Sequence, residues 1–136
     1  MTVNPRLIWL RSHFVEVVVL GAAGGFVMLL AELLMGAHTE GIQIVAVVSS
    51  ILGLVLVMLG FLGRGALRRG AIYGLLFVAF TGVFGVFEHI EEGGAEVGEA
   101  ESQEAVPPVL APLSLAGVGL LAGLALLVKD DAPAFG

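Results

Sequence analysis

The sequence predicts an all-α membrane protein in which four transmembrane helices form an up-down-up-down bundle. Of its 136 residues, 58% are hydrophobic and 13% are charged, and the mean hydropathy of +1.04 lies outside the range of soluble domains. The apolar residues fall into four long runs, and about 20 helical residues suffice to cross a hydrocarbon core of about 30 Å. No segment between these runs could bury a soluble core, so residues 1–136 are predicted to form a single membrane domain.

The predicted spans cover approximately residues 14–35, 42–62, 71–90 and 109–128. The connections after the first and second spans are short, which makes neighbouring spans antiparallel. The longer connection, 91–108, is rich in glutamate and is predicted to be a solvated acidic loop outside the cytoplasm. Its prolines suit the entry into the fourth span.

Positive charge is confined to one predicted side of the membrane. The basic residues are Arg6, Arg11, Arg64, Arg68, Arg69 and Lys129. None of them lies between the first two spans or between Gly70 and Val128. The positive-inside rule therefore predicts a multi-pass protein of the cell membrane with both termini in the cytoplasm, and Trp9 and Tyr73 fall where interfacial aromatic residues are expected.

Several classes of function receive no support from the sequence. The chain has no cysteine, which excludes disulfides, thiolate metal sites, iron–sulfur clusters and attached c-type haem. The serines have no histidine at a catalytic spacing, and no phosphate-binding glycine loop is present. A non-enzymatic role is therefore favoured over an enzyme, and no nucleic-acid partner is predicted.

Glycines recur at spacings typical of contacts between membrane helices. The pairs are Gly21/Gly25, Gly74/Gly85 and Gly119/Gly123, and they are predicted to serve packing within the bundle or with a partner. In the first span the alternating step of four and three residues runs through Phe14, Val18, Gly21, Gly25, Met28, Glu32 and Met35. In the third span it runs through Gly74, Val78, Thr81, Gly85, Glu88 and Glu92. Each series is predicted to form one packing seam.

The phenylalanines of the third span form a separate stripe predicted to face lipid or another protein; they are Phe77, Phe80, Phe84 and Phe87.

Both seams carry carboxylates at the predicted non-cytoplasmic end. Glu32 and Glu88 lie about 25–27 Å along their helices at about 1.5 Å per residue, so they are predicted at matching depth. Three further candidate metal ligands, His38, His89 and Glu92, are predicted on the same non-cytoplasmic side. Histidine and carboxylate groups suit Zn, Mn or Fe, and the absence of a basic residue nearby favours a divalent cation or proton handling.

Alternatives to this metal site remain open at the level of sequence. The carboxylates could simply be solvated or protonated at the membrane surface. A haem held by His38 and His89 is geometrically conceivable. The Glu-x-x-His pair of di-iron bundles is absent, because counting back from His89 gives Val86.

Three segments, "AELLMGAHTEG", "GVFGVFEHIEE" and "PPVLAPLSLAG", resemble those of a set of small, uncharacterised prokaryotic four-span integral membrane proteins. The resemblance implies the four-span fold and no particular activity, so no functional residues are carried over from it. Two hypotheses about function follow from the residues themselves. The first is a bundle whose outward-facing Glu/His cluster binds a divalent cation or handles protons. The second is an accessory subunit of a larger membrane complex, or a homo-oligomer.

Overall fold

The computed structural model describes residues 4–35, 43–95 and 110–129, without the side chains of residues 5, 7, 43, 89, 91–95, 110 and 111. The described residues are almost entirely helical and contain no strand, which confirms the all-α prediction. The helices are α1 (Pro5–Ser12), α2 (Phe14–Met35), α3 (Gln43–Leu62), α4 (Ala66–Ala95) and α5 (Leu110–Leu127).

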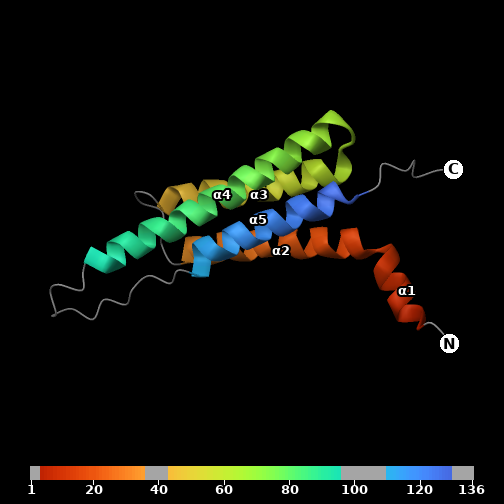
Figure 1. Ribbon diagram of the computed structural model, residues 1–136, viewed down its shortest axis with the longest axis horizontal. Helices are drawn as coiled ribbons and strands as arrows, with labels where there is room; N and C mark the ends of the chain where they lie inside the picture. The colour runs from red at the N-terminus through yellow and green to blue at the C-terminus, as the bar shows by residue number, and fades with distance from the viewer. Residues whose placement is uncertain (1–3, 36–42, 96–109, 130–136) are drawn as a thin grey trace.

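Helices α2 to α5 lie side by side, and consecutive helices run in opposite directions (Figure 1). Helix α2 packs against α3 and α5, and α4 packs against the same two helices. Helices α3 and α5 also touch each other, so α2 and α4 occupy the diagonal corners that lie farthest apart. This arrangement is compatible with the predicted four-helix bundle.

Three helical segments among the described residues are long and apolar enough to cross a membrane, namely Phe14–Met35, Ile44–Leu62 and Ala66–Glu88. The apolar part of α5, Pro112–Leu127, is shorter. Helix α4, which contains the third predicted span, is longer than that prediction. It begins at Ala66 and continues to Ala95, whereas the predicted span covers residues 71–90. Residues 91–95, which were expected to begin the acidic loop, are therefore helical.

The short helix α1 was not expected from the hydropathy pattern, although its start carries a recognisable signal. The Asn4 side chain accepts a hydrogen bond of 3.0 Å from the backbone N–H of Arg6, and Pro5 occupies the first turn. An asparagine cap followed by proline is a common beginning for a helix. The helix ends at His13, whose backbone is not helical, and α1 turns sharply away from α2 (Figure 1).

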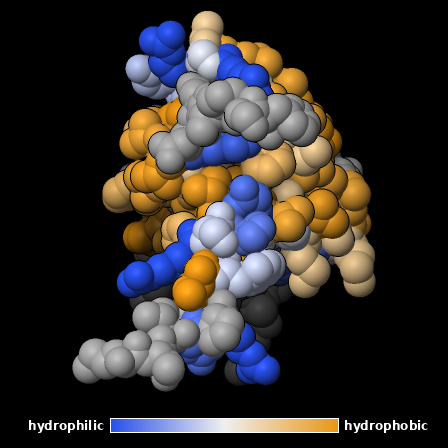
Figure 2. Space-filling view, turned by 90° about the vertical axis from the view of Figure 1, so that its right-hand side faces the viewer, coloured by the Kyte–Doolittle hydropathy of each residue, from blue (hydrophilic) through white to orange (hydrophobic). Residues whose placement is uncertain are grey.

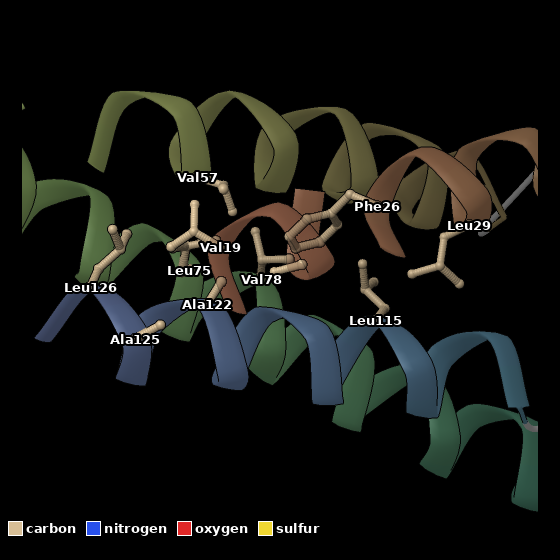
Figure 3. Packing of buried hydrophobic residues seen from close by; sticks show 11 residues of the cluster. Val19, Phe26, Leu29, Val57, Leu75, Val78, Leu115, Ala122, Ala125 and Leu126 are labelled. Carbon is tan, nitrogen blue, oxygen red and sulfur yellow. The ribbon is translucent and has the colours of Figure 1, made fainter. Parts of the chain in front are cut away.

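The core contains apolar side chains from all four long helices (Figure 3). Phe26 of α2 is its largest fully buried residue, and it packs against Gly53 of α3. A Cβ atom added at Gly53 would overlap the Phe26 ring, so the absence of a side chain there makes room for the aromatic group. The other fully buried apolar side chains of the core are Ala22, Val57, Leu75, Val78, Ala122 and Leu126.

Helices α4 and α5 approach each other closely through glycine. A Cβ atom at Gly82 would lie 2.6 Å from the backbone nitrogen of Ala116 and 2.7 Å from the backbone oxygen of Pro112. From the other side, a Cβ atom at Gly119 would lie 3.1 Å from backbone atoms of Leu75 and Ala79. Backbone atoms cannot rotate away as side-chain ends do, so these two glycines set the distance between the helices.

Two cationic side chains link the ends of three helices, α3, α4 and α5. They lie at the end of the bundle opposite to the carboxyl terminus of α4. Arg68 is 7% exposed and donates hydrogen bonds to the carbonyl of Gly63 (3.0 Å) and to that of Lys129 (2.9 Å). Lys129 in turn donates to the carbonyl of Phe61, and its ammonium group lies 3.7 Å from the centre of the Phe61 ring. The carbonyls at the carboxyl end of α3 have no partner within their own helix, and cations are favoured there.

Replacement of Arg68 by methionine is expected to lower the free energy of unfolding by about 3 kcal/mol, because one buried and one partly buried carbonyl lose a charged donor. Thermal unfolding of the detergent-solubilised protein, followed by circular dichroism, measures the change. The matched control is Arg69→Met, which alters the exposed neighbour on the same helix. Equal losses in the two variants would contradict a specific role for Arg68.

Gly82→Ala and Gly117→Ala are expected to change stability in opposite directions. Alanine favours a helix over glycine by about 1 kcal/mol, and Gly117 has no atom within 4 Å of an added Cβ. At Gly82 the added methyl group would meet backbone atoms, and overpacking of this kind costs about 1–3 kcal/mol. The same unfolding measurement tests the pair, and stabilisation by Gly82→Ala would show that α4 and α5 are not closely packed there.

Candidate functional site

Four of the five residues predicted to bind a metal lie on two helices that are not neighbours, α2 and α4. Glu32 is on α2, one turn before its end, and its side chain is exposed. Glu88 is on α4 and is half-buried. His89 and Glu92 are also on α4, but their side chains lie outside the described part of the chain, as does the whole of His38.

The carboxyl ends of α2 and α4 lie at the same end of the bundle, as predicted (Figure 1). The two helices nevertheless occupy diagonal corners, with α3 and α5 packed between them. Within residues 4–35, 43–95 and 110–129, no group of three histidine or carboxylate side chains is placed to hold a metal ion. Only two of the five predicted ligands, Glu32 and Glu88, have described side chains, so the metal site remains a prediction.

The predicted packing seam of α2 lies on the outside of the bundle. The side chains of α2 that are buried belong to Val19, Ala22, Phe26, Leu29 and Leu33. Figure 3 shows three of them, Val19, Phe26 and Leu29, directed toward the other helices. The predicted seam residues Phe14, Met28 and Met35 are exposed, Met28 by 73%. Within the bundle this seam therefore packs only in part, at Val18 and Gly25. Its packing with a partner stays a prediction.

Two glycines of the outward face of α2 have open space in front of them. A Cβ atom at Gly21 or at Gly24 would have no atom within 4 Å. Gly25, at the edge of this face, instead meets the side chain of Val118 on α5, at 3.0 Å from its nearest atom. Because Gly21, Gly24, Met28 and Glu32 lie within a narrow angular range of an ideal helix, we refer to them as the α2 outer face.

The seam of α4 is divided between interior and surface. Val78 is fully buried, an added Cβ at Gly74 would meet Leu56 of α3, and one at Gly85 would lie 3.1 Å from the Pro112 side chain. This places Glu88, one turn after Gly85, on the side of α4 near the start of α5. The four phenylalanines of the stripe, Phe77, Phe80, Phe84 and Phe87, are all more than half exposed, as their spacing predicts.

The buried hydroxyl groups have structural partners. Thr81 of α4 lies 3.3 Å from the hydroxyl of Ser49 on α3 and also donates to the carbonyl of Val78 at 2.8 Å. Ser50 donates to the carbonyl of Ala46, also at 2.8 Å. Hydrogen bonds of this kind satisfy hydroxyl groups inside an apolar bundle. The Ser49–Thr81 pair links α3 and α4 and offers no activated nucleophile.

The sequence predictions missed Gly24 and the role of α1. Gly24 does not belong to the four–three series, and only the burial pattern of α2 shows that it shares the outer face with Gly21. Helix α1 could have been found from Asn4 and Pro5. Its exposed side chains include Ile8, Trp9 and Leu10.

The described helices have the length and composition of a helical integral membrane protein. Comparison with protein-family models, with curated proteins and with solved structures found no match. The function is therefore inferred from the chain's own residues.

Proposed function

We propose that this chain is a four-span protein of the cell membrane, with both termini cytoplasmic, that acts as an interaction subunit. In this proposal the α2 outer face binds a helix of another membrane subunit or of a second copy. The observation that carries the proposal is the position of Glu32, which is exposed on the outside of the bundle beside two glycines with open space.

An outward carboxylate in a membrane helix needs a physical reason. A charged side chain costs about 2.5–3.5 kcal/mol at the centre of a span, and such residues usually face a protein interior or a water-filled cavity. Glu32 is nearer the end of α2, where the cost is lower, yet it faces away from the bundle. A partner helix would place hydrogen-bond donors beside it, and the absence of side chains at Gly21 and Gly24 would allow that helix to approach closely.

The proposed membrane arrangement follows from charge and helix length. All six basic residues of the sequence lie near the two termini, in the α3–α4 connection (Arg64) or in the first turn of α4 (Arg68 and Arg69), which favours the cytoplasm for that side. Helix α5 has 18 residues, or about 27 Å at 1.5 Å per residue. A hydrocarbon core of about 30 Å accommodates a helix of that length by thinning slightly, so α5 serves as the fourth span.

A photoreactive amino acid in place of Met28 is expected to cross-link to a partner in intact membranes, because that side chain projects from the α2 outer face. The matched control carries the same group in place of Phe80, which is comparably exposed but on α4. Mass spectrometry of the adduct distinguishes a second copy from another protein. The absence of an adduct at position 28, or equal adducts at both positions, would contradict the proposed interface.

A bulky side chain on the α2 outer face is expected to reduce this cross-linking without unfolding the protein. A Cβ atom added at Gly24 has no atom within 4 Å, so we expect the effect of Gly24→Leu to fall on the partner. Overpacking costs about 1 kcal/mol or more, which corresponds to about a fivefold weaker association. Gly117→Leu is the matched control on α5, and an equal loss in that variant would assign the effect to general disruption.

The second proposed function is binding of a divalent cation, or handling of protons, at the carboxyl end of α4. Glu88 is half-buried there, and the sequence has no lysine or arginine from Gly70 to Val128 to balance it. Carboxylates at a helix carboxyl terminus oppose the helix dipole, which a cation would offset. His89 and Glu92 would complete the site on α4, and Glu32 would join it only from another chain or after rearrangement.

Calorimetric titration of the detergent-purified protein with Zn, Mn, Fe(II) and Ca tests this second function. If Glu88 is a ligand, Glu88→Gln is expected to weaken binding of the preferred metal, since a neutral amide is a poorer donor than a carboxylate. Glu32→Gln tests whether Glu32 is a ligand or whether the site is formed by residues of α4 alone. An unchanged affinity in Glu32→Gln removes Glu32 from the site, and an unchanged affinity in both variants overturns it.

A further inference from the structure

Helix α1 exposes large apolar side chains outside the bundle. Ile8 and Trp9 are each 56% exposed, and Leu10 is also exposed. Successive residues of a helix are rotated by about 100°, so these three side chains point in different directions around α1. Together they span about 200° of the helix circumference, so much of the surface of α1 is apolar.

Local contacts among Trp9, Ser12 and His13 close the carboxyl end of α1 beside α2. The His13 ring stacks on the Trp9 ring, with their centres 4.8 Å apart and an angle of 18° between the planes. The hydroxyl of Ser12 donates to the carbonyl of Trp9 at 2.8 Å, and Nδ1 of His13 lies 3.0 Å from the same oxygen. Only His13 separates α1 from the apolar helix α2, so α1 ends directly beside the first candidate span.

The same end of the bundle is basic. Arg6 and Arg11 of α1 are exposed, as are Arg64 in the α3–α4 connection and Arg69 in the first turn of α4. In the described part of this end, Glu16 is the only carboxylate, and it is half-buried. Figure 2, which views this end, shows hydrophilic groups gathered between hydrophobic side chains.

We propose that α1 is an interfacial anchor that binds anionic phospholipids. Ile8, Trp9 and Leu10 enter the boundary between headgroups and acyl chains, while Arg6 and Arg11 extend to the lipid phosphates. Arg64 and Arg69 attract the same headgroups on the other side of the bundle end. This inference rests on membrane insertion of the long helices and does not depend on the α2 outer face.

Lipid is favoured over a protein partner by two observations. Helix α1 has eight residues, about 12 Å, which is too short to cross the bilayer but sufficient to lie along its surface. Its composition, with tryptophan and arginines beside apolar residues at the end of a span, is typical of the membrane interface. Four exposed arginines then give the surface a preference for negatively charged headgroups.

Trp9 is the only tryptophan of the chain, so its fluorescence reports on α1 alone. The full-length protein is reconstituted into phosphatidylcholine vesicles that contain, at equal mole fraction, either brominated phosphatidylglycerol or brominated phosphatidylcholine. Bromine quenches tryptophan on contact. Flotation of the vesicles after carbonate extraction establishes insertion in the same samples, independently of α1. We expect stronger quenching by the anionic lipid, and we expect added salt to diminish the difference.

The double variant Arg6→Gln/Arg11→Gln is expected to lose most of the preference, at about fivefold per arginine. Arg6→Lys/Arg11→Lys is the matched control and is expected to retain it, because the charge is unchanged. Equal quenching by the two lipids in the unaltered protein would overturn the choice of anionic lipid. Quenching by aqueous iodide alone would place Trp9 in water. Protection from both iodide and brominated lipid would place it against protein. Either result overturns the proposal that α1 is a lipid anchor.

Discussion

The close approach of α4 and α5 at Gly82 and Gly119 is the constraint on which the rest of the bundle depends. At both positions one helix lies against backbone atoms of the other, so the distance between them cannot be adjusted by rotating side chains. Helices α3 and α2 then pack beside this pair, and Phe26 of α2 occupies the space left by Gly53 of α3. Small residues at these positions turn four separately stable helices into one particular arrangement.

This arrangement determines which polar groups can meet. Arg68 and Lys129 satisfy carbonyls at one end of the bundle, and Ser49 and Thr81 pair in its interior. Glu32 on α2 and Glu88 on α4 lie at diagonal corners of the bundle, because α3 and α5 touch each other between these two helices. The polar residues that fold the chain are therefore distinct from the carboxylates that are available for a partner or a ligand.

The sequence predicted the candidate surfaces better than it predicted their assembly. Matching depth along α2 and α4 was sufficient to place Glu32 and Glu88 at one end, because helix rise is nearly constant. The phenylalanine stripe was also placed correctly on the outside. The buried side chains of α2 are mostly not those of the predicted seam, however, and Glu32 of that seam is exposed. Prediction failed there because both the interior and the lipid-facing side of such a helix are apolar, so polarity does not mark the buried face.

By itself, the sequence determined that the chain forms long apolar helices and that its basic residues belong to one end. Both properties are local, since they follow from hydropathy, helix rise and the order of residues along the chain. Only the tertiary structure decided which face of each helix is buried. That choice depends on steric fit between non-local residues, such as Phe26 with Gly53 and Gly82 with Ala116, and steric fit exists only when both helices are in place.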